Sequence, residues 1–209
     1  MSIMEIQKVR YSYDNKRNVL NGISTALDEG KMYAILGQSG CGKTTLLSLL
    51  GGLDSPLDGQ ILYDGQDIEK IGLANHRKKN VAFIFQSYNL IDYLTPKENV
   101  ALTAKLSPQP ILERVGLTEE ESKRNVLKLS GGQQQRVAIA RALASDAKVI
   151  LADEPTGNLD EDTATEIISI LKECAHQMKK CVVIVTHSNG LAKQADTVFC
   201  LKKGRLQQL

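Results

Sequence analysis

A glycine-rich segment ending in Lys-Thr is the first part of the chain that could do chemistry. Residues 37–44 read Gly-Gln-Ser-Gly-Cys-Gly-Lys-Thr and match GxxxxGK[ST] at every fixed position. Glycines let backbone N–H groups curl around phosphate oxygens, and a helix N-terminus adds positive potential. We expect Lys43 to reach the β- and γ-phosphates of a nucleotide and Thr44 to ligate Mg²⁺. A glycine turn that binds nothing is the alternative, which the flanking apolar runs disfavour.

Two adjacent carboxylates follow another apolar run. Residues 149–152 are Val-Ile-Leu-Ala and lead directly into Asp153 and Glu154. At the end of a strand beside a phosphate loop, Asp153 is suited to hold Mg²⁺, and Glu154 could accept a proton from an attacking water. Alone, the pair could simply cap the next helix. The presence of the phosphate loop favours the catalytic interpretation.

A second helix start suited to an anion lies at residues 129–133, which read Leu-Ser-Gly-Gly-Gln. Ser130 is a good N-cap, and Gly131 and Gly132 leave backbone donors bare. Two such helix starts on one nucleotide would be redundant, unless one of them serves the nucleotide of another subunit.

The elements that must position these residues alternate between strands and helices. Apolar runs at 33–36, 81–85, 149–152 and 182–186 predict strands, and the last three are apolar enough to be buried on both faces of a parallel sheet. Helical patterns cover 44–50, 133–144 and 163–179. The last has one apolar face, formed by Ile167, Ile170, Leu171, Cys174 and Met178. The alternation indicates an α/β fold with ligands at the carboxyl ends of its strands.

The two ends of the chain predict antiparallel structure. Residues 5–28 and 60–68 have the pattern of short, half-exposed strands, and residues 197–206 that of a hairpin turning at Lys203-Gly204. An accessory antiparallel sheet beside the α/β core would explain both ends.

Composition and charge exclude several classes of protein. The 209 residues carry a net charge of +2 without a basic stripe, which argues against a nucleic-acid partner. Cys41, Cys174, Cys181 and Cys200 form no CxxC pair, so we expect a reduced cytosolic chain without a zinc site, and Cys174 and Cys200 in the core. We see no signal peptide and no membrane span, so a membrane role requires a partner.

Taken in order, these motifs resemble those of the ABC ATPase family over nearly the whole chain. Residues 37–44 are similar to the Walker A motif, and residues 129–133 to the family signature. Asp153 and Glu154 resemble the Walker B aspartate and the catalytic glutamate. Gln86 resembles the Q-loop glutamine, His187 the switch histidine, and residues 158–160 the D-loop. Tyr13 falls where the family has its adenine-stacking aromatic residue, with Tyr11 as the alternative.

The residues within and around the motifs resemble those of the MacB/LolD/FtsE-type subgroup, as residues 85–100, 131–136 and 152–160 illustrate. Its members act as mechanical motors on a partner membrane protein in macrolide or peptide export, lipoprotein extraction or cell-wall remodelling. Residues 100–129 are shorter than usual in that group, so assignment to one member stays open. An FtsE-like regulatory ATPase without transport and a soluble non-transport ABC ATPase are the alternatives.

The resemblance implies a fold, a site and partners. The fold would be one domain over residues 1–209, with a P-loop (RecA-like) core, a parallel sheet, a flanking antiparallel β subdomain and a short helical subdomain at about 87–140. The cofactors would be ATP and Mg²⁺. The partners would be a transmembrane permease subunit and a second ATPase subunit, identical or related. The chain would be cytoplasmic and peripheral on the inner face of the cell membrane.

The site residues that the resemblance implies fall into four sets. The catalytic residues are Lys43, Gln86, Glu154 and His187. The ATP-binding residues are Tyr13, Gly37, Gln38, Ser39, Gly40, Cys41, Gly42, Lys43, Thr44 and Thr45. The residues that bind the ATP of the other subunit are Ser130, Gly131, Gly132, Gln133 and Asp160. The Mg²⁺ ligands are Thr44, Gln86 and Asp153.

Two further interpretations stay open. One is a coupling surface that contacts the membrane partner, with ordinary packing between subdomains as the alternative. Its candidate residues are Tyr88, Leu90, Ile91, Tyr93 and Leu94. The other concerns Cys41, whose place at a helix N-terminus favours a reactive thiol, with an inert loop residue as the alternative.

Overall fold

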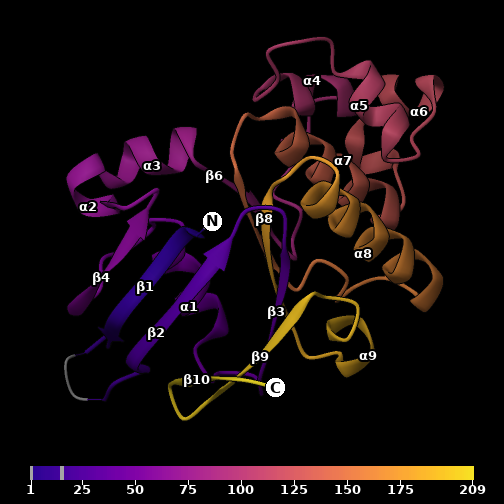
Figure 1. The fold of residues 1–209 in the computed structure, drawn as a ribbon. Helices are drawn as coiled ribbons and strands as arrows, with labels where there is room; N and C mark the ends of the chain where they lie inside the picture. Colours follow the sequence, from indigo (N-terminus) through magenta and orange to yellow (C-terminus); the bar gives the residue numbers. More distant parts are fainter. Residues whose placement is uncertain (1, 15–16) are drawn as a thin grey trace.

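Two sheets of different kinds meet in the computed structural model, which describes residues 2–14 and 17–209 (Figure 1). The larger sheet has the order β10-β9-β3-β8-β7-β6. All neighbouring pairs in it are parallel except β9 and β10. Its strands are β3 (Met32–Leu36), β6 (Val81–Ile84), β7 (Val149–Asp153), β8 (Cys181–Thr186), β9 (Thr197–Lys202) and β10 (Arg205–Gln208). The predicted α/β fold with a parallel sheet is confirmed.

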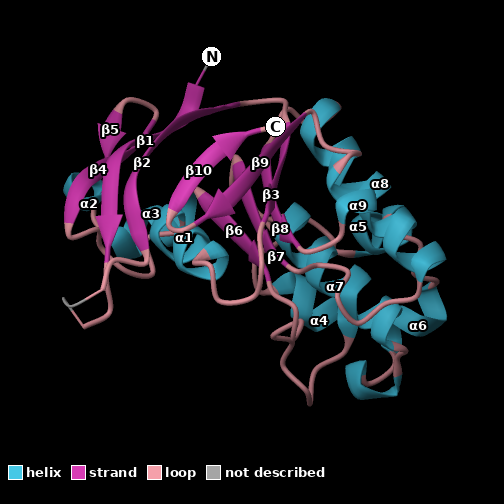
Figure 2. Cartoon of the chain, turned by 90° about the horizontal axis from the view of Figure 1, so that it is seen from below, coloured by secondary structure: helices cyan, strands magenta, loops and turns pink. Residues whose placement is uncertain are grey.

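The central strands are apolar on both sides because both faces of the larger sheet are covered. In β8, Val182 and Ile184 belong to one hydrophobic cluster, which also contains residues of α7 (Gly131–Ala144) and α8 (Glu161–His176). Val183 and Val185 belong to the other cluster, with residues of α1 (Lys43–Leu50) and the second sheet. Figure 2 shows this layering, with the second sheet and helices α4–α8 on opposite sides of the larger sheet.

The second sheet is antiparallel and has the order β2-β1-β4-β5. It comprises β1 (Ser2–Tyr11), β2 (Leu20–Asp28), β4 (Asp58–Tyr63) and β5 (Gln66–Asp67), as the sequence predicts for this end of the chain. It is followed by α2 (Ile68–Ile71) and α3 (Leu73–Lys79).

The C-terminal hairpin turns at Lys203 and Gly204 as predicted, but its assignment to the accessory sheet is wrong. β9 pairs in parallel with β3 and thereby extends the larger sheet. Its inward residues Phe199 and Leu201 are buried in the core, and this burial favours pairing with β3. The Asn21 N–H donates to the Gly204 carbonyl at 2.8 Å, so the hairpin tip also touches the second sheet.

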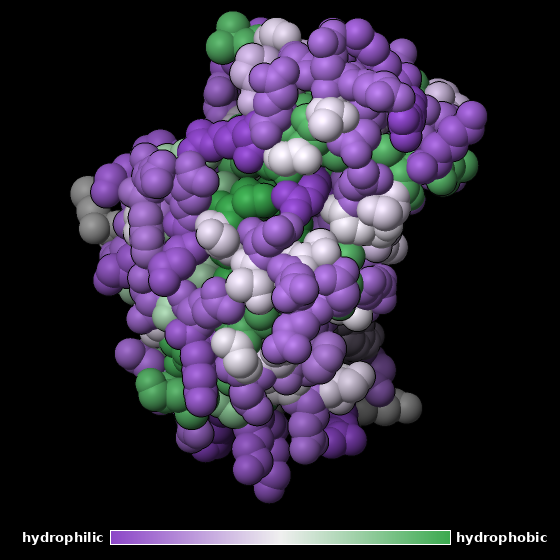
Figure 3. Space-filling model, turned by 90° about the vertical axis from the view of Figure 1, so that its right-hand side faces the viewer, coloured by the Kyte–Doolittle hydropathy of each residue, from purple (hydrophilic) through white to green (hydrophobic). Residues whose placement is uncertain are grey.

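Short helices form a lobe at one end of the molecule, at the top of Figure 1. They are α4 (Pro96–Ala101), α5 (Gln109–Arg114), α6 (Glu119–Lys123) and the 3₁₀ helix η1 (Val126–Lys128). In this lobe, Leu112 of α5, Leu117 of the loop before α6 and Val126 of η1 are buried and share one hydrophobic cluster with the sheet. The subdomain boundaries at 87–140 stay a prediction. Figure 3 shows one group of hydrophobic residues in a hollow below this lobe, on a largely hydrophilic face.

Two helix boundaries differ from those predicted. Helix α7 begins at Gly131, directly after its N-cap Ser130. Helix α8 begins earlier than predicted because the Asp160 side chain accepts the Thr163 N–H at 2.9 Å. It ends at His176, since Lys179 adopts a positive φ of 53° and the Lys180 N–H closes back on the Cys174 carbonyl at 3.3 Å. Met178 therefore lies beyond the helix, although it packs against the core.

The cysteines also differ in part from expectation. Cys174 and Cys181 are buried, whereas Cys200 is only half-buried, as is Cys41. The prediction of a core position is thus confirmed for Cys174 and wrong for Cys200, which lies near the edge of the sheet in β9.

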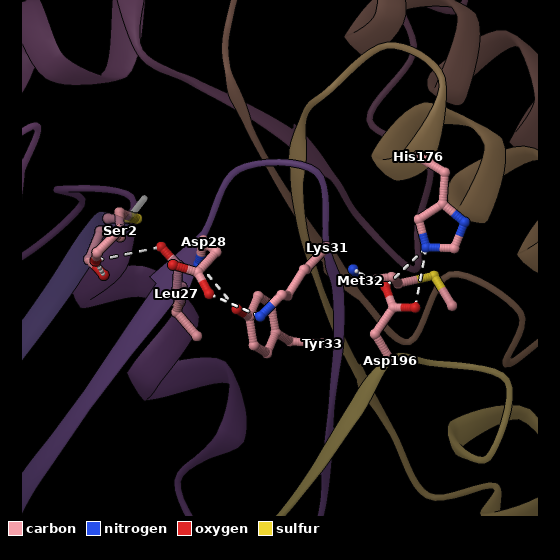
Figure 4. A network of polar contacts seen from close by, with 9 residues as sticks. Ser2, Leu27, Asp28, Lys31, Met32, Tyr33, His176 and Asp196 are labelled. Atoms are coloured by element: carbon pink, nitrogen blue, oxygen red, sulfur yellow. Dashed lines mark hydrogen bonds and ion pairs between the residues drawn. The ribbon is translucent and has the colours of Figure 1, made fainter.

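A chain of polar contacts gathers around the start of β3 (Figure 4). The Met32 N–H donates to Asp196 Oδ2 at 2.7 Å, and His176 Nε2 lies 2.9 Å from the same oxygen. On the other side, Lys31 Nζ is 2.8 Å from Asp28 Oδ2, and the Asp28 N–H donates to the Tyr33 hydroxyl. Asp196, which precedes β9, therefore ties the end of α8 to the start of β3.

We expect the Asp196→Asn protein to unfold at a lower temperature at neutral pH. Burial alone would raise the pKa of Asp196, but the Met32 N–H and the His176 ring hold it below its ordinary value. A carboxyl with a lowered native pKa stabilises the fold above its unfolded pKa, near 4, and loses that contribution as the pH falls through the native value. A loss of about 1 kcal/mol lowers Tm by roughly 2–4 °C.

Thermal unfolding of both proteins between pH 3 and pH 8 measures this effect. The gap in Tm should close as the pH falls below about 4, the ordinary aspartate range. A gap that stays constant over the whole range would show that the charge of Asp196 has no part in it.

Candidate functional site

The predicted site residues converge because parallel neighbouring strands end at one edge of the sheet. The segment 37–42 follows β3, Asp153 ends β7, and His187 follows β8. The pocket at this edge has a volume of about 550 Å³. Its lining residues are Tyr13, Val19, Ser39, Gly40, Gly42, Lys43, Thr44, Thr45, Gln86, Asp153, Glu154 and His187.

The start of α1 is open to an anion. Its N-cap is Gly42, with a left-handed φ of 104°, and among the described residues no side chain caps it. Its first turn contains no acidic residue. The backbone N–H groups at this helix start therefore remain available to an anionic ligand.

Glycine at position 37 is required by close contacts. A Cβ atom there would lie 2.5 Å from Cys41 Sγ and 2.8 Å from the Leu201 carbonyl oxygen in β9. The loop is thus packed against the neighbouring strand. The Cys41 side chain does not line the main pocket but an adjacent hollow of about 690 Å³, beside Lys203.

Glu154 lies between a lysine and a histidine. Lys43 Nζ donates to the Gly37 carbonyl at 2.8 Å and lies 3.9 Å from Glu154 Oε1. Glu154 Oε2 lies 3.0 Å from His187 Nδ1. The Glu154 and Lys43 side chains are only 15% and 8% exposed, against 71% for His187. A sheltered carboxylate with a cationic lysine and an imidazole beside it can take a proton and help to orient a water.

The backbone of Glu154 is strained. Its φ is +44°, a left-handed conformation that costs a non-glycine residue about 1–3 kcal/mol. Its N–H donates to the Val185 carbonyl at 3.0 Å, so the neighbouring strand β8 holds the residue in place. Strain of this kind is concentrated at functional sites.

Gln86 forms a wall of the pocket together with the segment after Glu154. A Cβ atom on Gly157 would lie 3.0 Å from Gln86 Nε2, and Asn158 Nδ2 donates to the Gln86 carbonyl at 3.5 Å. Gly157 was not among the predicted site residues. Its position three residues after Glu154 could have indicated that it lies at the site.

The structure distinguishes between the two candidate aromatic residues. Tyr11 is buried and its hydroxyl contacts Asp54, which together with burial raises the pKa of Tyr11 to about 12. Tyr13 is 72% exposed at the pocket, with its hydroxyl 2.7 Å from Thr45 Oγ1. Tyr13 is therefore the ring that can stack on a ligand. Val19, which follows the same loop and also lines the pocket, was not predicted.

The residues expected to act on another subunit form a second group. Ser130 caps α7, and its side chain accepts the Gln133 N–H at 3.2 Å. A Cβ atom on Gly132 would lie 2.8 Å from Thr163 Cγ2, and Thr163 is bound by the α8 cap Asp160. Among the described residues that line the pocket, none belongs to this second group.

Comparisons with known proteins agree with this geometry. Residues 20–157 match the family model described as ABC transporter. An uncharacterized ABC transporter ATP-binding protein of Bacillus subtilis strain 168, YclH, is 46% identical over 98% of this chain and 95% of its own length. The macrolide export ATP-binding/permease protein MacB 2 of Aeromonas hydrophila is 41% identical over 97% of this chain, which spans 33% of that protein.

Solved structures include two dimeric forms of the bacterial ABC transporter cassette MJ0796. The first has a TM-score of 0.86 and 34% identity, covering 99% of this chain and 98% of that one. The second, a post-hydrolysis state bound to ADP and Pi, has the same TM-score and coverage at 33% identity. The family model covers more than half of the chain, and the relatives lie well above 30% identity over nearly all of it. The chain therefore belongs to the ABC transporter family.

Proposed function

We propose that this chain binds ATP and hydrolyses it as the motor subunit of an ABC transporter whose membrane-spanning part is a separate protein. The observation that carries the proposal is the meeting of Lys43, Glu154 and His187 in one pocket beside the open start of α1. The similar cassette MJ0796 has been solved with ADP and Pi, which supports the same chemistry here.

Each group near Glu154 has a role in hydrolysis that its position supports. The N–H groups at the start of α1 and Lys43 hold the phosphates of ATP. Glu154 accepts the proton of the attacking water. Lys43 and His187 stabilise the negative charge that develops on the terminal phosphate. Tyr13 stacks on the adenine through its exposed ring.

Three oxygen-bearing side chains at the pocket fit a magnesium site. Thr44 in the first turn of α1, Gln86 and Asp153 all line it. Hydroxyl, amide and carboxylate oxygens are the ligands that Mg²⁺ prefers. Mg²⁺ held there would neutralise phosphate charge.

The second group of residues supports a dimer. Ser130, Gly131, Gly132, Gln133 and Asp160 lie outside the pocket of their own chain. The start of α7 offers backbone donors to an anion, so the nucleotide of a second, identical or related chain is the natural ligand. MJ0796 is dimeric in its solved form, which supports two chains that enclose ATP head to tail.

A groove between α3, β6, the segment after α4 and α7 is suited to a membrane partner. It has a volume of about 840 Å³ and an apolar part that includes Phe83, Phe85 and Leu102. Basic residues at its rim include Lys78 and Lys79, which are exposed. Within residues 2–14 and 17–209, every helix is too short or too polar to span a bilayer. Docking of a cytoplasmic segment of a permease here would hold the chain at the inner face of the membrane.

The candidate coupling surface begins at Tyr88, three residues after Phe85 of the groove. Tyr93 is 80% exposed, whereas Leu90 packs partly against the core. Both interpretations of this segment, contact with the partner and packing between subdomains, stay open.

The decisive test is light scattering on the Glu154→Gln protein with and without MgATP. The substitution keeps the shape of the side chain but removes the base, so bound ATP persists and should hold two chains together. We expect a monomer without nucleotide and a dimer with MgATP. Glu69→Gln, at an exposed position of α2, is the matched control and should stay monomeric, because it should hydrolyse ATP like the parent protein.

The other outcomes separate the parts of the proposal. A persistent monomer that still binds ATP would contradict a dimer of identical chains. A protein that binds no ATP would refute the proposed function as a whole.

Alkylation of Cys41 is expected to block ATP binding, and MgATP is expected to protect the thiol. Added bulk on Sγ would displace the loop, because Gly37 leaves no room beside it. We expect ATP affinity to fall by roughly tenfold or more, the value of one lost charge-assisted hydrogen bond. The label should be counted by mass spectrometry and ATP binding measured by titration.

A Cys200→Ser background removes the other half-buried thiol. Burial raises the pKa of Cys174 and of Cys181 to about 12, so these two should not react. Full ATPase activity after complete labelling would mean that Cys41 is an inert loop residue.

A further inference from the structure

The start of α7 is tied to α6 by a continuous chain of hydrogen bonds. The Thr118 N–H and hydroxyl donate to Glu121 Oε2 at 2.7 and 2.8 Å. Gln133 Nε2 donates to Glu121 Oε1 at 2.6 Å. The Ser130 N–H donates to Gln133 Oε1 at 2.9 Å. Two capping boxes, one at each helix start, are thus joined through Glu121 and Gln133.

The two ends of this series of hydrogen bonds determine which side-chain types can stand at the two positions between them. Each end is a backbone N–H, which can only donate. A carboxylate only accepts, whereas an amide does both. Every donor in this series of hydrogen bonds therefore has an acceptor when one of positions 121 and 133 holds a carboxylate and the other an amide. Two amides would leave a donor facing a donor, and two carboxylates would place like charges in contact.

The charge of Glu121 is stabilised locally. The Thr118 N–H and hydroxyl lower the pKa of Glu121, and Arg124 and Arg136 contribute. Glu121 is half-buried, so its contact with Gln133 is partly sheltered from water. It is therefore ionised at neutral pH and stays an acceptor.

Other contacts brace α7 one turn further along. Arg136 Nη1 donates to the Val115 carbonyl at 2.7 Å, and Arg136 forms an ion pair with Glu166 of α8. These contacts hold the body of the helix. The Glu121–Gln133 contact acts on the first turn, where the bare donors of Gly131 and Gly132 stand.

We propose that Glu121 is a positioning residue for the site that two chains form together, because through Gln133 it sets the orientation of the turn that receives the nucleotide of the second chain. This inference rests on the proposed function. Groups that bind a ligand in this way must be held to within about 0.5 Å, which packing and supporting hydrogen bonds provide. Glu121 itself does not touch the nucleotide.

A reciprocal exchange tests the proposal in the Glu154→Gln background. The variants are Glu121→Gln, Gln133→Glu and the double exchange, with Glu120→Gln as the matched control. Glu120 lies next to Glu121 on α6, but its partner is the exposed Arg124. The readouts are the dimer dissociation constant in MgATP by light scattering, ATP affinity of the monomer, and hydrogen exchange of the amides at 130–133.

We expect each single substitution to raise the dimer dissociation constant by roughly tenfold, since each dimer contains two such turns. Exchange protection at 130–133 should fall in parallel. The double exchange restores the pattern of donors and acceptors and should recover most of both losses. ATP affinity of the monomer should stay unchanged in the Glu121→Gln and Glu120→Gln variants, because neither residue lines the pocket.

Single variants that dimerise like their parent would overturn the proposal. So would a double variant that regains neither exchange protection nor dimerisation, since the losses would then not come from the pattern of donors and acceptors. A parent protein that binds ATP but stays monomeric contradicts the proposed dimer instead. Hydrogen exchange at 130–133 then decides whether Glu121 positions this turn. Protection that is lost in the single variants and regained in the double variant supports that role, and protection that is the same in all variants refutes it.

Discussion

Replacing Lys43 with alanine is expected to abolish measurable ATP hydrolysis and to weaken ATP binding by about one to two orders of magnitude. Lys43 Nζ points into the pocket, 3.9 Å from Glu154 Oε1, and its side chain is almost fully buried. Charge-assisted hydrogen bonds contribute about 1.5–3 kcal/mol, which corresponds to roughly 10- to 150-fold in affinity. Loss of one group that stabilises transition-state charge costs about another 10²–10³ in rate.

Titration with a fluorescent ATP analogue and a phosphate-release assay measure the two effects. Lys202→Ala, an exposed lysine at the end of β9, is the matched control and should leave both values unchanged. Circular dichroism verifies that the fold is intact. Hydrolysis within tenfold of the parent rate would show that Lys43 does not act on the phosphates.

The second large effect concerns stability, at the far end of the helix that begins with Lys43. Gly51 caps the C-terminus of α1, and a Cβ atom there would lie only 1.9 Å from Cζ of Phe83. The Phe83 ring is stacked on Phe85 with centroids 5.2 Å apart, so it cannot move aside freely. We expect Gly51→Ala to destabilise the fold by about 1–3 kcal/mol, as overpacking does, and to lower Tm by roughly 3–10 °C.

Gly190→Ala is the matched control for this substitution. Gly190 has no positive φ, and its nearest neighbour would be Ser188 Oγ at 4.0 Å, so the added methyl group should change Tm little. Differential scanning calorimetry of both variants measures the difference. Phe83→Leu combined with Gly51→Ala should recover part of the loss, and equal Tm values for the two alanine variants would contradict the packing argument.

The central strands and their ligand edge could be predicted because they follow from local patterns. The apolar runs at 149–152 and 182–186 become β7 and β8, whose residues alternate between two cores. Parallel strands end at the same edge, so the phosphate loop, Asp153 and His187 had to meet.

The pairing of the C-terminal hairpin could not be predicted from its local pattern. The alternation at 197–206 specifies a hairpin but not the strand beside which it lies, and β3 offered an open edge. The choice between Tyr11 and Tyr13 depended on which ring is buried, and the burial of Tyr11 beside Asp54, far along the chain, could not be read from local sequence. The contact of Glu121 with Gln133 likewise required the placement of α6 against α7.

Helix α7 has its first turn among the residues predicted to meet a second chain and its last turn in the wall of the groove, where Arg141 and Ala142 lie. Arg141 also donates to the carbonyls of Tyr88 and Asn89, close behind Gln86. Its 14 residues span about 21 Å at 1.5 Å each. If the helix moves as a rigid body, a tilt of about 5° around its midpoint moves its two ends by about 1 Å in opposite directions. We therefore expect a displacement at the groove to produce a shift of atomic size at the residues predicted to meet the second nucleotide.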